Sequence, residues 1–289
     1  MQKSNIELLI NKALTVLSQL EHFLPPLPTP TDWNAKAFRW EKKGHTAYLA
    51  PIHHLALIHP EDLHFVDKQK EAIDQNTYQF LQGLPANNVL MTGSRGTGKS
   101  SLVKAMLDKY ANKGLRLIEI DKSDLKDLNQ IITLVSGRPE KFIIFCDDLS
   151  FEEGEAGYKE LKSILDGSVS ASTENILIYA TSNRRHLMPE KMQDNLDSHY
   201  VNGDLHPSES IEEKVSLSER FGLWLTFYSF TQDEYLNIVD YWLRQLNCPE
   251  QHISASHTEA LQWATQRGSR SGRIARHFAK YWTAKYLQK

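Results

Sequence analysis

Residues 88–101 decide the fold and read Asn-Val-Leu-Met-Thr-Gly-Ser-Arg-Gly-Thr-Gly-Lys-Ser-Ser. Val89 to Thr92 form a short, mainly apolar run that is typical of a buried parallel strand. Gly93 to Ser100 match the pattern G-x-x-x-x-G-K-[ST] in full. The chain then resumes with apolar residues at helical spacing, namely Leu102, Val103, Met106 and Leu107. The order strand, glycine-rich loop, helix therefore predicts a phosphate-binding loop.

The chemistry of this loop predicts a nucleotide site. Its glycines let backbone N–H groups turn inward around phosphates, and the helix N-terminus adds a partial positive charge. We expect Lys99 to reach the β- and γ-phosphates and the Ser100 hydroxyl to contact Mg²⁺. The predicted nucleotide-binding residues are Gly93, Ser94, Arg95, Gly96, Thr97, Gly98, Lys99, Ser100 and Ser101. A glycine-rich turn without a ligand is the alternative, and the Lys-Ser pair with its flanking strand and helix disfavours it.

Composition sets the class of protein. With 289 residues, 40% apolar content, 24% charged residues and a net charge of −3, the chain is an ordinary globular sequence with no general preference for nucleic acid or anionic membranes. Two cysteines do not make a disulfide framework, and Cys146 lies in an apolar run that we expect to be buried. No run approaches the ~20 apolar residues of a membrane span, and no signal peptide is recognisable. The expected compartment is the cytoplasm.

The first thirty residues carry a narrow apolar seam. Its members recur at spacings of four and three, namely Ile6, Ile10, Ala13, Leu17, Leu20 and Leu24. This spacing predicts a helix that packs on its own domain or on a neighbouring subunit. Pro25 to Pro30 favour extended geometry. We therefore predict an N-terminal helix and proline-rich linker over residues 1–30.

The rest of the chain divides into two predicted domains. Aromatic residues between positions 33 and 65 predict order there, and His53, His54, His59 and His64 of that stretch lack the ligand spacing of a metal site. Further strands are expected at Leu115–Ile120, Phe142–Cys146, Ile176–Ala180 and Leu223–Phe230, with helical segments between them. This alternation predicts a parallel α/β nucleotide-binding domain over residues 31–230.

Residues 231–289 are predicted to form three helices. Thr231–Glu234 and Ser256–Glu259 have the capping-box pattern and are expected to start two of them. Gly268 is expected to end the second helix, and the third is expected to begin near Ser271. The pattern predicts a small helical domain on the α/β core.

Polar residues follow two of the predicted strands at the point where each strand ends. A strand that ends in an acid beside a phosphate loop supplies a Mg²⁺ ligand, so we assign this role to Asp147. Asn183 follows the next strand, and its amide can orient a water molecule. Helix capping by Asp148 and a plain turn role for Asn183 remain alternatives. Arg220 directly precedes the last strand, and a solvated surface arginine is its alternative.

Taken together, these residues resemble the AAA+ ATPases over about residues 62–289. The resemblance implies a P-loop parallel sheet flanked by helices and a C-terminal all-helical lid domain, with ATP and Mg²⁺ as ligands. It makes the Lys99–Ser100 pair the Walker A motif and Asp147 the Walker B magnesium carboxylate. By the same resemblance, Asn183 is sensor 1 and Arg220 is an arginine finger. Arg273, at the start of the last helix, is similar to sensor 2.

More closely, the chain resembles the bacterial family filed as domain of unknown function 815. The runs that carry this resemblance span residues 85–90, 146–152, 179–187, 218–222 and 268–273. One residue departs from the wider superfamily, in which glutamate usually follows the Walker B aspartate. Asp148 is one methylene shorter, so it would polarise the attacking water from further back. Glu152 or Glu153 is the alternative base, and Asp148 is the leading candidate.

The leading prediction is an ATPase that hydrolyses MgATP and converts nucleotide state into motion of its lid and of a neighbouring subunit. Lys99, Asp148, Asn183 and Arg220 are its predicted catalytic residues. It is expected to act on an unknown protein client as a ring-like homo-oligomer, with a hexamer favoured. A slowly hydrolysing ATP-dependent switch is the alternative from another class.

A nucleic-acid-handling ATPase of the initiator or loader kind is a further alternative. Between Ala264 and Lys289 the chain has no acidic residue and seven basic ones: Arg267, Arg270, Arg273, Arg276, Lys280, Lys285 and Lys289. The slightly acidic total charge disfavours this function. A threading unfoldase is also disfavoured, because Asp121–Leu125 lacks an aromatic–apolar–glycine pore loop.

Overall fold

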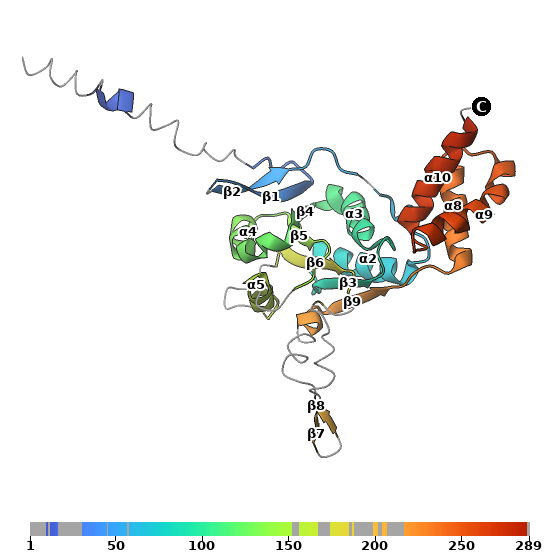
Figure 1. Cartoon of the computed structure of the whole chain (residues 1–289). Coiled ribbons are helices and arrows are strands. Elements are labelled where there is room, and N and C mark those ends of the chain that lie inside the picture. Colours follow the sequence, from blue (N-terminus) through green and yellow to red (C-terminus); the bar gives the residue numbers. More distant parts are fainter. Residues whose placement is uncertain are drawn as a thin grey trace, which may run out of the picture.

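A seven-stranded sheet forms the centre of the protein in the computed structural model (Figure 1). Its strand order is β2-β1-β4-β5-β6-β3-β9. The strands are β1 (Ala37–Lys43), β2 (Thr46–Pro51), β3 (Val89–Gly93), β4 (Leu115–Ile120), β5 (Lys141–Cys146), β6 (Ile176–Ser182) and β9 (Leu223–Phe227). A separate two-stranded ladder pairs β7 (His199–Val201) with β8 (Asp204–His206).

The structure describes residues 10, 12–16, 31–44, 46–56, 58–151, 156–166, 174–184, 187, 199–201, 204–206 and 217–287. The predicted linker over Pro25–Pro30 and the alternative bases Glu152 and Glu153 lie outside these residues. Most of the predicted N-terminal seam also lies outside them. Within the described part, no helix is long and apolar enough to cross a membrane.

The predicted parallel sheet is confirmed. β4, β5, β6, β3 and β9 are all parallel to their neighbours, and β1 is parallel to β4. The last strand ends at Phe227, so the prediction that it extends to Phe230 was wrong. The carboxyl ends of β5, β6 and β3 therefore meet at one edge of the sheet, where the phosphate loop begins.

The pair β1 and β2 was not predicted as strands and makes the sheet mixed. β2 is antiparallel to β1 through a turn at Gly44, which has φ +63°. In β1 the buried Phe38 and Trp40 lie on either side of the exposed Arg39 and pack on one face of the sheet, whereas the buried Ala37 packs on the other face. Trp40 Nε1 donates to Asp127 Oδ2 at 3.1 Å, and this bond ties the hairpin to the turn after β4.

Helices cover both faces of the sheet (Figure 1). On one face, α2 (Asp67–Leu81) and α3 (Lys99–Tyr110) pack against Val89, Met91 and Phe145. On the other face, α4 (Leu128–Val135) and α5 (Ala156–Leu165) pack against Ile118, Ile144 and Ile178. Alternate residues of the same strands thus enter two separate cores, as the period of two in a strand requires.

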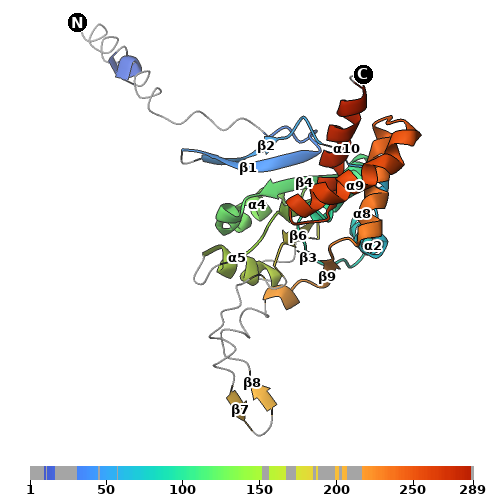
Figure 2. The same cartoon turned by 45° about the vertical axis from the view of Figure 1, so that its right-hand side comes forward.

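The C-terminal helices form a third core beside the sheet, as Figure 2 shows from a second side. They are α8 (Gln232–Gln245), α9 (Glu250–Gln266) and α10 (Gly272–Leu287). The predicted capping box at Thr231 is confirmed, because its side chain accepts from the Glu234 N–H. The predicted start at Ser256 was wrong, since α9 begins at Glu250 and the buried Ser256 hydroxyl donates to the Ile253 carbonyl at 2.6 Å. The division of the chain at residue 230 stays a prediction.

A buried polar cluster fixes the entry to β3. Asn76 on α2 accepts from the Asn87 backbone N–H at 2.9 Å and donates to the Asn87 carbonyl at 2.9 Å. The same amide donates to the Tyr179 hydroxyl at 3.1 Å, and Thr77 shares that hydroxyl at 2.9 Å. Because every member is paired, the cluster costs little to bury and fixes α2 against β3 and β6.

The Asn76→Ala substitution should lower the free energy of unfolding by about 1–3 kcal/mol, because it removes both hydrogen bonds to the Asn87 backbone and one of the two partners of the buried Tyr179 hydroxyl. Urea denaturation followed by circular dichroism measures this loss. Gln82→Ala, at an exposed position just after the same helix, is the matched control and should change the value by no more than about 0.5 kcal/mol. Equal stability of the two variants would contradict the role given to Asn76.

Candidate nucleotide-binding site

The phosphate loop, residues 93–98, lies between β3 and the N-terminus of α3. Gly93 has φ +125°, and a Cβ there would lie 1.9 Å from the Phe227 carbonyl oxygen. Only glycine fits such a conformation and such a close approach. The Ser94 N–H donates to the same Phe227 oxygen at 3.2 Å, so β9 supports the loop directly. The predicted strand, loop and helix are therefore present as one continuous unit.

Lys99 is the most deeply placed charged group of the site, with 6% of its surface exposed. Its ammonium donates to the backbone carbonyls of Gly93 and Ser94, at 2.7 and 2.8 Å, and to Asn183 Oδ1 at 3.1 Å. Burial removes water from the ammonium and lowers the pKa of Lys99 to about 8, against the opposing attraction of Asp147 and Asp148. This cation lies where the phosphate chain of a nucleotide is expected to bind.

Ser100 and Asp147 lie together at the end of β5. The Ser100 hydroxyl donates to Asp147 Oδ1 at 2.6 Å. Thr181, at the end of the neighbouring strand β6, donates to the same oxygen at 2.5 Å. Hydroxyl and carboxylate oxygens are ligands that Mg²⁺ accepts, and one or two such protein ligands together with phosphate oxygens make an ordinary magnesium site. The Ser100–Asp147 pair therefore fits a magnesium ion.

Asp148 has an unusual backbone. Its φ is +53°, in the left-handed region that Asp tolerates better than most residues. Its carboxylate oxygen Oδ1 accepts from the Asn183 amide at 2.5 Å, and Oδ2 lies 3.7 Å from Arg95. The predicted water-polarising acid and the predicted sensor amide are thus in direct contact. Their roles in catalysis stay predictions.

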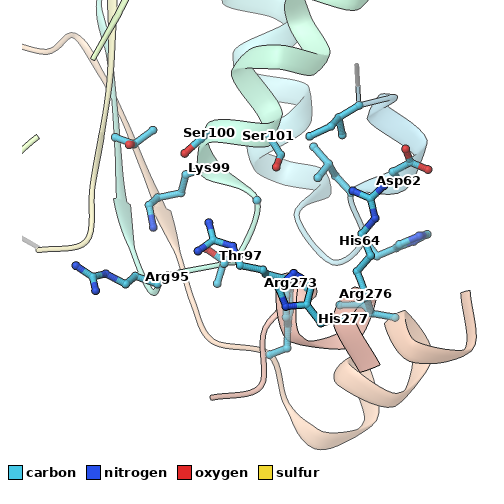
Figure 3. Close-up of a pocket in the computed structure, with 18 of the residues that line it drawn as sticks. Asp62, His64, Arg95, Thr97, Lys99, Ser100, Ser101, Arg273, Arg276 and His277 are labelled. Carbon is cyan, nitrogen blue, oxygen red and sulfur yellow. The ribbon is translucent and has the colours of Figure 1, made fainter. Parts of the chain in front are cut away.

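A cleft of about 540 Å³ surrounds these groups. Figure 3 shows Arg95 and Lys99 at one end, Asp62 and His64 at the other, and Arg273 on the lid side. A volume between 300 and 1,000 Å³ is ordinary for a small-molecule site. The cleft is lined by residues of the phosphate loop, of segment 58–64 and of the helical lid, so three distant parts of the chain complete it.

The lid touches the phosphate loop directly. The Gly272 N–H, at the start of α10, donates to the Gly96 carbonyl at 3.0 Å. A Cβ on Gly96 would lie 2.8 Å from Ser271 Oγ, so this close approach requires glycine. The predicted Arg273 lines the cleft beside this contact. The phosphate loop and the start of α10 are therefore joined by a direct hydrogen bond.

Several residues of the cleft were missed from the sequence. Asp62 ends η1 (Pro60–Asp62), Leu63 and His64 follow it, and no local pattern marks these three residues. Burial lowers the pKa of His64, which favours its neutral form. Ile58 and Thr181 were also missed, as were several residues on the lid, namely Phe230, Ile238, Trp242, Arg276 and His277. Arg276 and His277 could have been found, because they lie three and four residues after Arg273 and so share its helix face.

Arg220 lies away from this cleft. It follows a short helical turn at residues 217–219, and its side chain forms an ion pair with Asp166 just after α5. It is absent from the lining of the cleft, whereas Arg95, Arg273 and Arg276 are present. The predicted capping box at Ser210–Glu213 lies outside the described residues. The geometry therefore separates Arg220 from the nucleotide site of its own chain, and its role as a finger stays a prediction.

The basic residues of the lid are mostly committed to contacts within the chain. Arg267 lies 3.6 Å from the ring centre of Trp263, and Lys285 pairs with Glu259 at 3.3 Å. Arg273 and Arg276 line the cleft. Within the part of the lid that the structure describes, Arg270 and Lys280 have no such contact, and the four cations that do have one are exposed as well. A nucleic-acid surface on the lid therefore stays an alternative.

Comparison with known families gives one match over most of the chain. The sequence profile described as "Protein of unknown function (DUF815)" matches residues 33–286. No curated protein matches the chain significantly.

Solved structures show the same fold at low identity. A chain of the E. coli MS115-1 HORMA:CdnC:Trip13 complex aligns with a TM-score of 0.50 and 10% identity, over 76% of this chain and 89% of that one. The Thermotoga maritima RuvB Holliday junction branch migration motor aligns with a TM-score of 0.46 and 16% identity, over 76% of this chain. This chain spans only 62% of that RuvB chain. The sheet, the phosphate loop and the C-terminal helices together confirm the AAA+ P-loop fold.

The lowered pKa of Lys99 predicts a pH dependence of ATP binding. Below about pH 8 the ammonium is already protonated in the free protein, so affinity should not change with pH through Lys99. Above that value ATP must draw a proton onto Lys99, and the affinity should fall by up to about tenfold per pH unit. Calorimetric titration with ATP in buffers of different ionisation enthalpy measures both the affinity and the proton uptake.

Lys99→Arg is the control, because arginine stays charged throughout this range. Its ATP affinity should therefore lack the fall above pH 8. A wild-type affinity that stays constant from about pH 7 to about pH 9.5, with no proton uptake, would contradict the lowered pKa.

Proposed function

Because the chain belongs to the family described as "Protein of unknown function (DUF815)" and has the AAA+ fold, we propose that it is an ATPase that binds and hydrolyses MgATP. One observation carries this proposal. Lys99, the Ser100–Asp147 pair and the Asp148–Asn183 pair converge in a single cleft at the carboxyl edge of the sheet. These are the groups that phosphate binding, metal binding and water activation require.

ATP binding begins at the phosphate loop. The N-terminus of α3 and the loop N–H groups attract the phosphate oxygens. Lys99 would exchange its carbonyl partners for the β- and γ-phosphates, and Arg95 and Arg273 add positive charge on either side of the loop. The Ser100 hydroxyl and the Asp147 carboxylate would hold Mg²⁺, which neutralises phosphate charge when bound. The adenine ring of ATP would lie toward the apolar side chains of Leu63 and Ile238.

Hydrolysis is an in-line attack of water on the γ-phosphorus. Asp148 would draw a proton from the attacking water, and Asn183, which already bonds Asp148, would orient that water. The bond between the γ-phosphorus and the bridging oxygen breaks, and ADP and phosphate leave. Lys99 stabilises the charge that spreads over the γ-phosphate oxygens in the transition state.

The free energy of ATP hydrolysis would drive a movement of the lid. The contact of Gly272 with Gly96 couples the loop to the lid, so loading and release of phosphate would change how the lid sits. We propose that the chain works as a ring-like homo-oligomer, with six subunits as the favoured number. In such a ring Arg220 would face the nucleotide of the next subunit. The client is proposed to be a protein.

A slowly hydrolysing switch is the second candidate, and one observation favours it. The Asp148 carboxylate already accepts from Asn183 through Oδ1 and has Arg95 3.7 Å from Oδ2, so fewer of its lone pairs are open to the attacking water. The aspartate side chain is also short. A single-turnover rate that is slow alone and rises when a partner protein is added would select the switch.

Two substitutions test the proposed ATPase. Lys99→Ala should weaken ATP binding by about 10- to 100-fold, because it removes charge-assisted bonds to phosphate. Asp148→Asn should keep MgATP bound and slow hydrolysis by about 10²- to 10⁴-fold, because it removes the general base. Calorimetry measures binding and phosphate release measures turnover.

Asp124→Asn serves as the control, since this acid pairs with Lys42 far from the cleft. It should match wild type in both assays. Wild-type ATP affinity in folded Lys99→Ala protein would overturn the proposed function. Normal turnover of Asp148→Asn would instead show that another residue is the base.

Arg220→Ala should bind ATP as wild type does and hydrolyse it about 10³-fold more slowly, as expected of an arginine that acts on the neighbouring subunit. Mixing it with Lys99→Ala should restore part of the activity, since each subunit supplies what the other lacks. Asp166→Ala is the matched control, because it removes the same ion pair and keeps the arginine. If Asp166→Ala loses as much activity as Arg220→Ala, Arg220 serves only through its contact with Asp166.

A further inference from the structure

The Thr181 side chain joins the two acids of the site. Thr181 belongs to β6 and has 1% of its surface exposed. Its hydroxyl donates to Asp147 Oδ1 at 2.5 Å and accepts from the Asp148 N–H at 2.9 Å. Its backbone carbonyl accepts from the Leu149 N–H at 2.6 Å. One residue of β6 therefore bonds three successive residues at the end of β5.

These bonds orient the Asp147 carboxylate. Its Oδ1 accepts from Ser100 and Thr181, and the Asp148 N–H lies 3.2 Å from the same oxygen. Among the residues that the structure describes, Oδ2 accepts no hydrogen bond. A carboxylate held through one oxygen presents the other in a fixed direction, which is what a metal ligand needs.

The same bonds support the left-handed turn at Asp148. A non-glycine residue with φ +53° persists only where its surroundings determine it. The Thr181 hydroxyl accepts from the Asp148 N–H and the Thr181 carbonyl accepts from the Leu149 N–H, so the peptide groups on both sides of Asp148 are hydrogen-bonded to Thr181. In this conformation the short Asp148 side chain reaches the amide of Asn183, which lies two residues after Thr181. Asn183 directly follows the end of β6, and the bonds of Thr181 to Asp147 and of Asn183 to Asp148 place both side chains beside the acids.

We propose that Thr181 is a positioning residue that aligns Asp147 for the metal and Asp148 for water. The inference rests on the proposed binding of MgATP. This role of Thr181 explains how the short Asp148 side chain can act on water at a position where a glutamate would be one methylene longer. The left-handed turn brings the backbone of Asp148 closer to the attacking water, and Thr181 holds that turn in place. Thr181 acts through its bonds to these two residues.

Three substitutions at this position separate the hydroxyl from the rest of the side chain. Thr181→Val keeps the shape and removes the hydroxyl. Thr181→Ser keeps the hydroxyl, and Thr181→Ala lacks it, so these two variants differ by one oxygen atom. If the valine variant does not fold, the serine–alanine pair decides. Circular dichroism and thermal melting check the fold of each.

The readout is metal affinity, which requires no hydrolysis. Mn²⁺ replaces Mg²⁺, and its binding at saturating ADP is followed by electron paramagnetic resonance. Thr181→Ala and Thr181→Val should weaken Mn²⁺ binding by about 10- to 100-fold, as removal of a partner of a metal ligand does. Their affinity for ADP in EDTA should stay that of wild type, and Thr181→Ser should restore Mn²⁺ binding.

A second readout follows Asp148. At saturating Mn²⁺ and ATP, the single-turnover rate of Thr181→Ala should remain below that of Thr181→Ser by about tenfold or more. Equal Mn²⁺ affinity in the alanine and serine variants overturns the proposal and leaves the ATPase function intact. A wild-type protein that binds MnADP without hydrolysing ATP overturns the hydrolytic function instead, and the metal readout still decides the role of Thr181.

Discussion

The site depends on one constraint, which is the almost complete burial of the Lys99 ammonium. Burial lowers the pKa of Lys99 to about 8, and the attraction of Asp147 and Asp148 opposes that fall, so the ammonium keeps its charge near neutral pH. Two backbone carbonyls and Asn183 accept its hydrogen bonds. Those carbonyls face the ammonium only because Gly93 turns the chain against β9 with φ +125°. In the proposed ATPase, Lys99 would exchange these carbonyls for phosphate oxygens, which are stronger hydrogen-bond partners because they are charged.

Around this lysine the fold assembles parts that are distant in sequence. Parallel strands bring their carboxyl ends to one edge, so the acids after β5 and the amide after β6 lie beside the loop after β3. The lid adds Arg273 and an apolar wall that includes Ile238 and Trp242, and residues 62–64 add the opposite wall of the cleft. Asp62 Oδ1 accepts from the Tyr241 hydroxyl at 2.5 Å, which joins that segment to the lid. The lid is therefore bonded both to the phosphate loop and to the far wall of the cleft.

The sequence by itself determined the class of fold and the centre of the site. Local patterns were sufficient for the phosphate loop, five strands of the sheet and the capping box at Thr231, because strand periodicity, glycine spacing and caps are short-range effects. They failed where tertiary packing overrode them. Ser256 fits a cap but is buried inside α9, where its hydroxyl bonds Ile253. The strands β1 and β2 were missed because their alternation becomes decisive only against β4.

Only the tertiary structure decided which of the predicted residues share a cleft. Asn183 and Asp148 are in direct contact, whereas Arg220 is paired with Asp166 outside the cleft. It also revealed the wall at Asp62 and His64 and the bonds that Thr181 makes to both acids. The physical reason is the same in each case. Strand ends, loops and lid come together through hydrogen bonds between residues tens of positions apart, and no local pattern in a single sequence encodes such a contact.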